Sequence, residues 1–367
     1  MKRVLFLVNR DFVLYNFRIE LVSKLLSDGY EVFICLPNGP KVKEMVDMGC
    51  KYIPIEIDRR GTNPLNDIQL INSYRKIFKQ INPDVVLMYT TKVVIYGGIV
   101  AGMMKIPYLL NVSGLGTAVE NRSPIQRLMI FLYKSAVKNA SCVFFQNHEN
   151  YDFFKKHEIK VKTYRIIPGS GVNLEKWYEM PYPKEENGLQ FLFIARIIKE
   201  KGIEEYLKIA KYYKERNNNY TFHILGPCDG EYEDILKEYH KKGIIIYHGM
   251  IQDTRAFIAN SHCTIHPSYY PEGISNVLLE SAACCRPVIT TNRPGCRDTV
   301  DNNISGYIFE ERNTDDLIDK MNMFIHLSWD EKRRMGIAGR KKVEKEFDRN
   351  IVISAYMEEI ERIDASK

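Results

Sequence analysis

The chain has 367 residues, 45% of them hydrophobic, and a formal net charge of +6 at pH 7. This length exceeds one ordinary hydrophobic core, so we expect two domains, and the apolar content excludes a disordered or fibrous protein. The apolar runs at residues 4–8 and 128–133 are much shorter than the roughly 20 residues of a membrane span. We therefore expect a globular cytoplasmic protein that begins with a strand, without a signal peptide or a transmembrane segment.

Cysteine spacing and charge distribution narrow the function class further. The eight cysteines include no C-x-x-C pair, which indicates buried free thiols in a reducing compartment and neither a zinc nor a redox site. Residues 1–180 hold 25 Lys and Arg against 16 Asp and Glu, a net +9, whereas residues 181–367 hold 27 against 30. A basic first half suggests an anionic partner, and because no nucleic-acid motif is present, we expect an anionic membrane surface.

Strand-like and helical segments alternate along the first half. A helical stretch at residues 16–27, ended by Gly29, joins the first two strands into a βαβ unit. Long segments separate the remaining predicted strands, so we expect crossover helices and a parallel doubly wound sheet. The strands are expected at residues 3–8, 31–36, 51–57, 84–88, 107–112 and 141–145.

A second alternating set follows a polar, Pro-rich stretch at residues 171–188, which has the composition of a linker. Its strands are expected at residues 190–195, 220–225, 244–248, 263–266 and 287–291. The fold class is therefore α/β with two Rossmann-like domains. No G-x-G-x-x-G follows the first strand, which argues against a nicotinamide or flavin dehydrogenase.

The segment from Glu272 to Glu280 contains the most informative pattern. Ser275 suits the N-cap of a helix over residues 277–283, and the free N–H groups of such a first turn attract anions. Gly273 allows a ligand to approach the backbone. A diphosphate fits between the two carboxylates, with Glu272 binding a sugar and Glu280 a ribose, which is the layout that a nucleotide-sugar needs.

This Glu-x7-Glu pattern resembles the signature of family 4 glycosyltransferases, retaining enzymes of the GT-B fold. Pro267-Ser268 precedes the pattern, and the segments 287–291, 294–296 and Gly306-Tyr307 follow it where the family has counterparts. The resemblance implies two Rossmann-like domains facing each other across a cleft. It divides the chain into an acceptor domain at 1–170, a linker at 171–188, a donor domain at 189–348 and a helix at 349–367 that crosses back to the first domain.

The resemblance also implies where the donor binds. Arg196 and Lys201, after the strand at 190–195, fit the family's diphosphate-binding pair and would stabilise charge on the leaving group. Glu272 would orient the sugar. The amides of Gly273, Ile274, Ser275 and Asn276 would contribute to the same site. Gly226, Gly249 and Ile251 lie on loops that approach the nucleotide in the family.

In the first domain, the loop Ser113, Gly114, Leu115 and Gly116 follows a strand and allows close approach to the reacting sugar. This loop and the segment 15–18 resemble the subgroup that extends polyprenyl-diphosphate-linked sugars for bacterial surface polysaccharides or glycoproteins. Ser113 stands where many members have a histidine that contacts the donor sugar, and Cys285 stands where the family usually has glycine.

Arg127, Lys134 and Lys138 fall on one face of a helical stretch at residues 123–138. Two interpretations remain open for this helix. It is either a basic amphipathic helix on the inner face of the cytoplasmic membrane or an ordinary domain helix with its charged side in water.

The resemblance favours a retaining glycosyltransferase that moves a hexose or N-acetylhexosamine from a UDP-sugar to a hydroxyl of a lipid-linked saccharide, without a metal or other cofactor. One alternative is a nucleotide-sugar 2-epimerase of the same architecture, which needs acid–base groups such as His148, His223, His248 or His266. Another is a non-catalytic protein that binds a sugar nucleotide. The identity of the sugar stays open.

Overall fold

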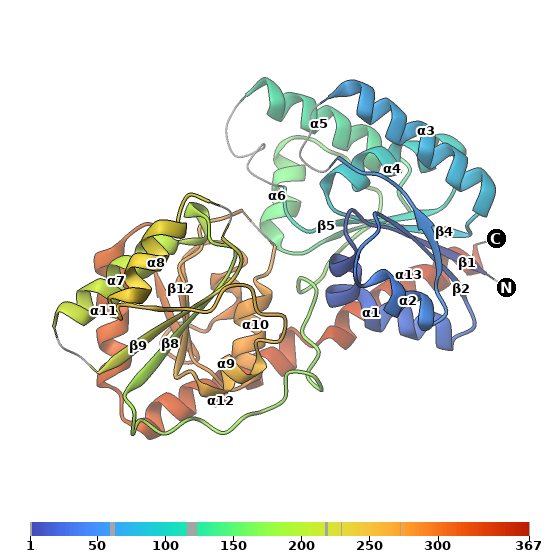
Figure 1. Cartoon of the computed structure of the whole chain (residues 1–367). Coiled ribbons are helices and arrows are strands. Elements are labelled where there is room, and N and C mark those ends of the chain that lie inside the picture. The colour runs from blue at the N-terminus through green and yellow to red at the C-terminus, as the bar shows by residue number, and fades with distance from the viewer. Residues whose placement is uncertain are drawn as a thin grey trace. The chain divides into compact units, whose positions relative to one another are not determined.

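The computed structural model describes residues 2–58, 63–115, 123–216, 219–228, 230–271 and 273–366. The chain forms two compact units, each with its own parallel sheet (Figure 1). The first unit comprises Met1–Ser170 with Asn350–Lys367, and the second comprises Gly171–Arg349.

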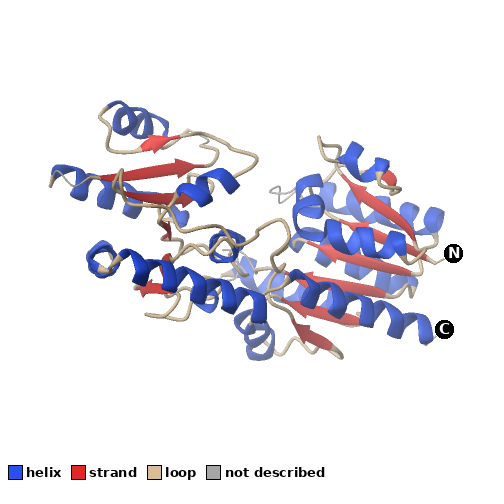
Figure 2. Ribbon diagram, turned by 90° about the horizontal axis from the view of Figure 1, so that it is seen from below, coloured by secondary structure: helices blue, strands red, loops and turns tan. Residues whose placement is uncertain are grey.

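The first unit is a seven-stranded parallel sheet in the order β3-β2-β1-β4-β5-β6-β7. Its strands are β1 (Arg3–Leu7), β2 (Glu31–Leu36), β3 (Lys51–Pro54), β4 (Val85–Tyr89), β5 (Tyr108–Val112), β6 (Cys142–Phe145) and β7 (Tyr164–Ile166). Its helices are α1 (Asp11–Ser27), α2 (Val42–Asp47), α3 (Pro64–Ile81), α4 (Thr91–Met104), α5 (Pro124–Val137), α6 (His148–Lys156) and α13 (Arg349–Ala365). Figure 2 shows the strands of each unit between layers of helices.

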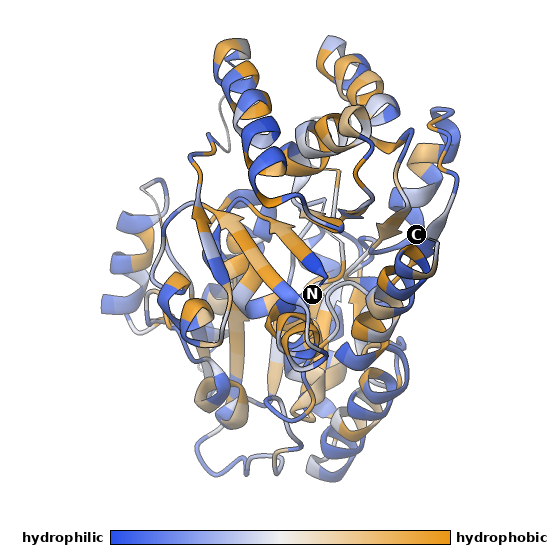
Figure 3. Cartoon of the chain, turned by 90° about the vertical axis from the view of Figure 1, so that its right-hand side faces the viewer, coloured by the Kyte–Doolittle hydropathy of each residue, from blue (hydrophilic) through white to orange (hydrophobic). Residues whose placement is uncertain are grey.

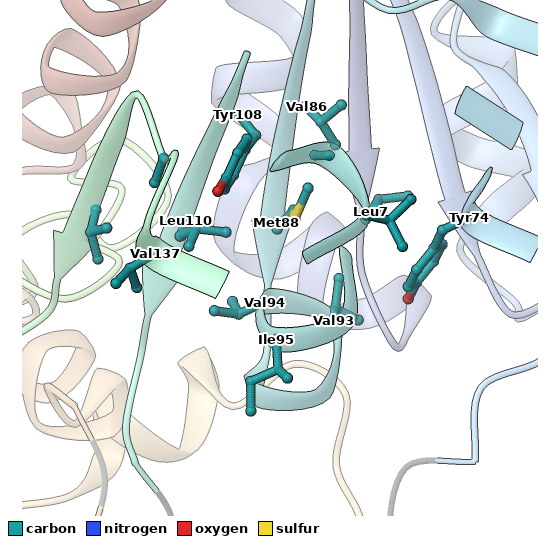
Figure 4. Packing of buried hydrophobic residues seen from close by; sticks show 14 of the residues in the cluster. Leu7, Tyr74, Val86, Met88, Val93, Val94, Ile95, Tyr108, Leu110 and Val137 are labelled. Carbon is teal, nitrogen blue, oxygen red and sulfur yellow. The ribbon is translucent and has the colours of Figure 1, made fainter. Parts of the chain in front are cut away.

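The central strands of this unit are apolar on both faces, as expected for a parallel sheet covered by helices. Leu7 and Met88 point into one core cluster, whereas Phe6 and Leu87 point into the other. In Figure 4, Met88 of β4 lies over Val93 and Val94 of α4. The second cluster contains Val352, Tyr356 and Ile360 of α13, so the last helix completes the core of the first unit.

The second unit is a six-stranded parallel sheet in the order β10-β9-β8-β11-β12-β13. Its strands are β8 (Leu189–Ile194), β9 (Tyr220–Leu225), β10 (Ile246–Tyr247), β11 (Cys263–His266), β12 (Val288–Thr291) and β13 (Gly306–Phe309). Its helices are α7 (Ile203–Glu215), α8 (Glu233–Lys241), α9 (Arg255–Asn260), α10 (Asn276–Ala283), α11 (Thr314–His326) and α12 (Trp329–Glu346), with 3-10 turns η2 (Lys199–Lys201) and η3 (Arg297–Thr299). Figure 3 shows the hydrophobic colour of the strands against helices of mixed character.

The predicted fold class of two Rossmann-like parallel sheets is confirmed. The strands predicted at 31–36, 220–225 and 263–266 have the predicted bounds. The first helix begins at Asp11 rather than at residue 16, and β7 and β13 were missed. β7 has three residues, none of them fully buried, and β13 begins with a glycine, so neither has the apolar pattern of a central strand.

The stretch at 171–188, predicted as a linker, is grouped with the second unit. Trp177 and Met180 are buried in a core cluster of that unit. The fully buried Arg286 fixes the stretch, because its guanidinium donates to the carbonyls of Met180 and Pro181 and also to those of Ile258, Ala259, Cys284 and Cys285. A buried arginine thus adds backbone hydrogen bonds to the packing of these side chains.

All eight cysteines are free thiols, and seven of them are buried. Cys285, which stands where the resembling family usually has glycine, has φ 59° directly after α10. This left-handed conformation is the one that glycine favours after a helix, so the turn before Pro287 forms in spite of the side chain. In the described part of the chain, no helix is long and apolar enough to cross a membrane.

Candidate functional site

The order of strands in the second sheet reverses at one place. From β8 the chain builds outward to β9 and β10 on one side, and then to β11, β12 and β13 on the other. The loops that leave the carboxyl ends of β8 and β11 therefore diverge, and in open α/β sheets ligands bind at such a switch point. The predicted site residues Arg196 and Lys201 follow β8, and Ser275 and Glu280 follow β11.

Arg196 and Lys201 are brought together by an aromatic ring that the sequence analysis missed. The Arg196 Cζ atom lies 5.6 Å and the Lys201 Nζ atom 5.1 Å from the centre of the Tyr270 ring. Both distances are within the range of a cation–π interaction. Arg196 is exposed, whereas Lys201 is only 8% exposed. The sequence signal was an aromatic residue two positions before Glu272, in the loop after β11.

Backbone contacts hold the same two loops together. The N–H of Tyr269 donates to the carbonyl of Glu200 over 2.9 Å. Gly202, with φ 78°, lies so close to the β11 loop that a Cβ atom there would stand 2.2 Å from the carbonyl oxygen of Pro267. Only glycine permits this approach, and it fixes the position of Lys201 relative to Tyr270.

Helix α10 begins at the switch point with its first turn uncapped by a side chain. Ser275 occupies the predicted N-cap position but makes no side-chain capping bond, and its Oγ lies 3.3 Å from Nε2 of the buried His266. The N–H of Ser275 donates to the carbonyl of Gly295. The first-turn amides of this eight-residue helix, which the Ser275 side chain does not cap, therefore suit an anion. Asn276 is the first helical residue and Gly273 lies two positions before the N-cap, whereas the side chain of Ile274 is buried in the core.

Glu280 lies one turn inside α10. Burial raises the pKa of its carboxyl group to about 7, while the positive charges of Lys176 and Arg349 act in the opposite direction. Since the charged form gains from added hydrogen-bond donors, a ligand hydroxyl at this carboxyl would lower its pKa again.

The three glycine-loop predictions differ in what the structure shows. A Cβ on Gly226 would lie 1.7 Å from the carbonyl oxygen of Ala195, so close backbone packing alone requires glycine there. Gly249, with φ 69°, has open space where a Cβ would be, and its carbonyl accepts from the N–H of Gly226. Ile251 packs its side chain partly against a core cluster. Gly249 is therefore the one of these three whose surroundings leave room for a ligand.

The remaining predicted residues belong to the first unit or lie outside the described residues. Glu272 and Gly116 belong to the latter group. In the first unit, Ser113 follows β5 and is exposed, Gly114 is half-buried and Leu115 packs into the core.

The histidines proposed for acid–base chemistry do not form one cluster. His148 is exposed at the start of α6 in the first unit. The Nδ1 of His223 lies 3.0 Å from Nε2 of His248, and its Nε2 lies 2.9 Å from Oε1 of Gln190. Burial and, to a smaller extent, the charge of His248 lower the pKa of His223 to about 4, so this ring is neutral at pH 7. Both of its nitrogens already have hydrogen-bond partners. Across the described residues, His, Cys, Asp and Glu side chains form no group of three that could hold a metal ion.

Two sequence-family profiles match the chain. The profile described as "Glycosyl transferases group 1" matches residues 179–342, and the profile described as "Glycosyl transferase 4-like" matches residues 3–147.

Curated relatives match over nearly the whole chain. An N,N'-diacetylbacillosaminyl-diphospho-undecaprenol alpha-1,3-N-acetylgalactosaminyltransferase of Campylobacter jejuni is 26% identical over 98% of this chain and 99% of its own length. The capsular polysaccharide biosynthesis glycosyltransferase CapM of Staphylococcus aureus is 25% identical over 94% of this chain and 92% of its own.

Solved structures share the fold. Sucrose-phosphate synthase of Thermosynechococcus elongatus has a TM-score of 0.83 at 17% identity, with both chains covered completely. HepE of Anabaena, solved with UDP and glucose, has a TM-score of 0.78 at 14% identity, covering 99% of this chain and 100% of its own.

The Tyr270 ring gives a test of the switch-point site. We expect Tyr270→Leu to weaken binding of UDP about tenfold, because the ring that holds the two cations in place for the diphosphate, through contacts of roughly 0.5–1 kcal/mol each, is lost. Tyr270→Phe keeps the ring face and should stay within about twofold of the unmodified protein. Isothermal titration calorimetry measures both variants, and equal losses in the two would show that the ring face does not act on the cations.

Proposed function

The chain belongs to family 4 of the glycosyltransferases, and from this premise we propose that it is a retaining enzyme that transfers a hexose or N-acetylhexosamine from a UDP-sugar to a hydroxyl of a lipid-linked saccharide. The observation that carries the proposal is the pairing of Arg196 and Lys201 on one ring, at the switch point from which α10 begins. Two cations and an uncapped helix N-terminus are the groups that a diphosphate requires.

The relatives support the rest of the substrate assignment. The printed name of the Campylobacter jejuni relative states an N-acetylgalactosamine donor group and a diphospho-undecaprenol acceptor. Its match extends over both units, so we propose a donor and an acceptor of the same two classes for this chain. UDP, which is bound in the HepE structure of the same fold, is the nucleotide that we propose for the donor.

The proposed mechanism needs no enzymic nucleophile. The bond between the anomeric carbon and the diphosphate breaks while the acceptor oxygen attacks on the same face, and the proton of the acceptor hydroxyl passes to an oxygen of the leaving phosphate. Arg196, Lys201 and the first-turn amides of α10 stabilise the leaving group, and Glu272 orients the sugar. Placement and electrostatic stabilisation then account for most of the catalysis, without a metal ion.

The 2-epimerase alternative receives less support from the side chains. Elimination and readdition of the nucleotide require an acid–base group that exchanges a proton with the sugar. His223 is engaged by Gln190 and His248, and its pKa of about 4 makes it a weak base.

Glu280 makes the affinity for UDP depend on pH. If its carboxylate accepts hydrogen bonds from the ribose, UDP binds the deprotonated form, and the free protein holds a proton there below its pKa of about 7. We therefore expect the affinity to rise about tenfold from about pH 6 to about pH 8, as the deprotonated fraction increases. Calorimetry should show this rise relative to Glu280→Gln, in which only the phosphate of UDP titrates. Parallel pH profiles in the two proteins would contradict the ribose contact.

Product analysis tests the reaction itself. A panel of UDP-hexoses and UDP-N-acetylhexosamines is incubated with a polyprenyl-diphosphate-linked sugar, with and without excess EDTA. We expect a lipid-linked disaccharide whose new linkage keeps the anomeric configuration of the donor by NMR, in equal yield with EDTA. An inverted linkage would rule out the retaining mechanism, and an epimerised UDP-sugar without a disaccharide would favour the epimerase.

A further inference from the structure

Helix α5 has three different faces. Its inner face packs Tyr133, Ala136 and Val137 into the first unit, next to α4. Its basic face carries Arg127 and Lys134, followed by Lys138 at the C-cap, and all three are exposed. The third face is apolar and exposed: Ile125, Leu128 and Phe131 are 60%, 56% and 66% accessible to solvent.

The spacing places these faces side by side. With about 100° of rotation per residue, Ile125, Leu128 and Phe131 form one stripe along the helix. Phe131 is the member of this stripe nearest to the cations Arg127 and Lys138. An ordinary domain helix has an apolar inner face and a polar outer face. Here an additional apolar stripe, which we call the outer stripe of α5, borders the basic face. This combination is characteristic of helices that lie in a membrane interface.

Two further exposed apolar side chains lie on helix α3, which begins at the same edge of the sheet as α5. Leu65 and Ile68 occupy the first turns of α3 and are 67% and 54% exposed. Helices α3 and α5 both pack against α4, and each follows a parallel strand, so all three begin at the carboxyl edge of the sheet. In Figure 1 these helices form one layer along the top of the first unit.

We propose that the outer stripe of α5, together with Leu65 and Ile68, inserts into the interface of an anionic lipid bilayer, with Arg127, Lys134 and Lys138 against the lipid headgroups. The inference rests on the proposed lipid-linked acceptor and adds how the enzyme reaches it. The net +9 of residues 1–180 complements an anionic leaflet. A symmetric dimer through this face would bring the same cations of two copies together, so charge disfavours a second copy as the occupant.

The surface is tested by flotation of the full-length protein with vesicles of phosphatidylcholine and phosphatidylglycerol, at low and at high salt. One variant replaces the outer stripe (Ile125→Ser, Leu128→Ser, Phe131→Ser). A second reverses the basic face (Arg127→Glu, Lys134→Glu, Lys138→Glu). A control replaces three exposed apolar residues elsewhere (Val46→Ser, Ile304→Ser, Met323→Ser).

We expect the unmodified protein and the control to float at low salt and to keep part of their binding at high salt, because apolar insertion is not screened. The stripe variant should lose about tenfold in vesicle affinity per side chain, which corresponds to about 1.4 kcal/mol each, and should keep no salt-resistant binding. The charge-reversal variant should show its largest loss of vesicle binding at low salt. Equal flotation of the stripe variant and the control overturns the proposal, as does a dimer that dissociates only in the stripe variant.

Calorimetry with UDP on the same preparations separates this inference from the proposed function. Normal UDP affinity in a stripe variant that no longer floats shows an intact fold and supports the membrane surface. Unmodified protein that binds UDP and transfers sugar but fails to float overturns the surface and leaves the proposed function in place. Protein that floats through the stripe but transfers no sugar contradicts the proposed function alone.

Discussion

The reversal of strand order between β8 and β11 is the constraint on which the candidate donor site depends. Because the chain leaves these adjacent strands in opposite directions, their loops open at the carboxyl edge and a helix N-terminus comes to that edge. The close backbone approach of Gly202 to Pro267 then sets how near the cations of one loop come to the aromatic ring of the other. The strand order therefore determines where the candidate site lies, and its side chains determine which groups it can bind.

Cations and backbone N–H groups gather at this edge. Arg196 and Lys201 lie against the face of Tyr270, and the Ser275 side chain does not cap the helix N-terminus. Burial raises the pKa of the Glu280 carboxyl to about 7, so this group is about half ionised at neutral pH. A nucleoside diphosphate offers phosphate oxygens to the cations and the N–H groups, and ribose hydroxyls to the carboxyl. Preorganisation of this kind is how an enzyme stabilises charge that develops on a leaving group.

Sequence periodicity was sufficient for the fold class, because long apolar strands such as those at 31–36 and 220–225 alternate with helical segments. It did not reveal β7, which has no fully buried residue, or β13, which begins with glycine. It also did not reveal that Arg286 donates to the distant carbonyls of Met180 and Pro181. Motif spacing pointed to the loop after β8 that carries Arg196 and Lys201 but could not find Tyr270, because aromatic residues are common and only the folded loops place this ring beside both cations. The exposed stripe of α5 was missed for the same reason, since exposure of apolar side chains is decided by tertiary packing.

The central claim is that the diphosphate of the donor binds at the switch point of the second sheet. A crystal structure of the protein with UDP is its most direct test. We predict density for the diphosphate within hydrogen-bond distance of Arg196, Lys201 and the first-turn amides of α10, with the ribose hydroxyls at Glu280. A diphosphate bound at another edge of the sheet, or to the first unit, would contradict the claim.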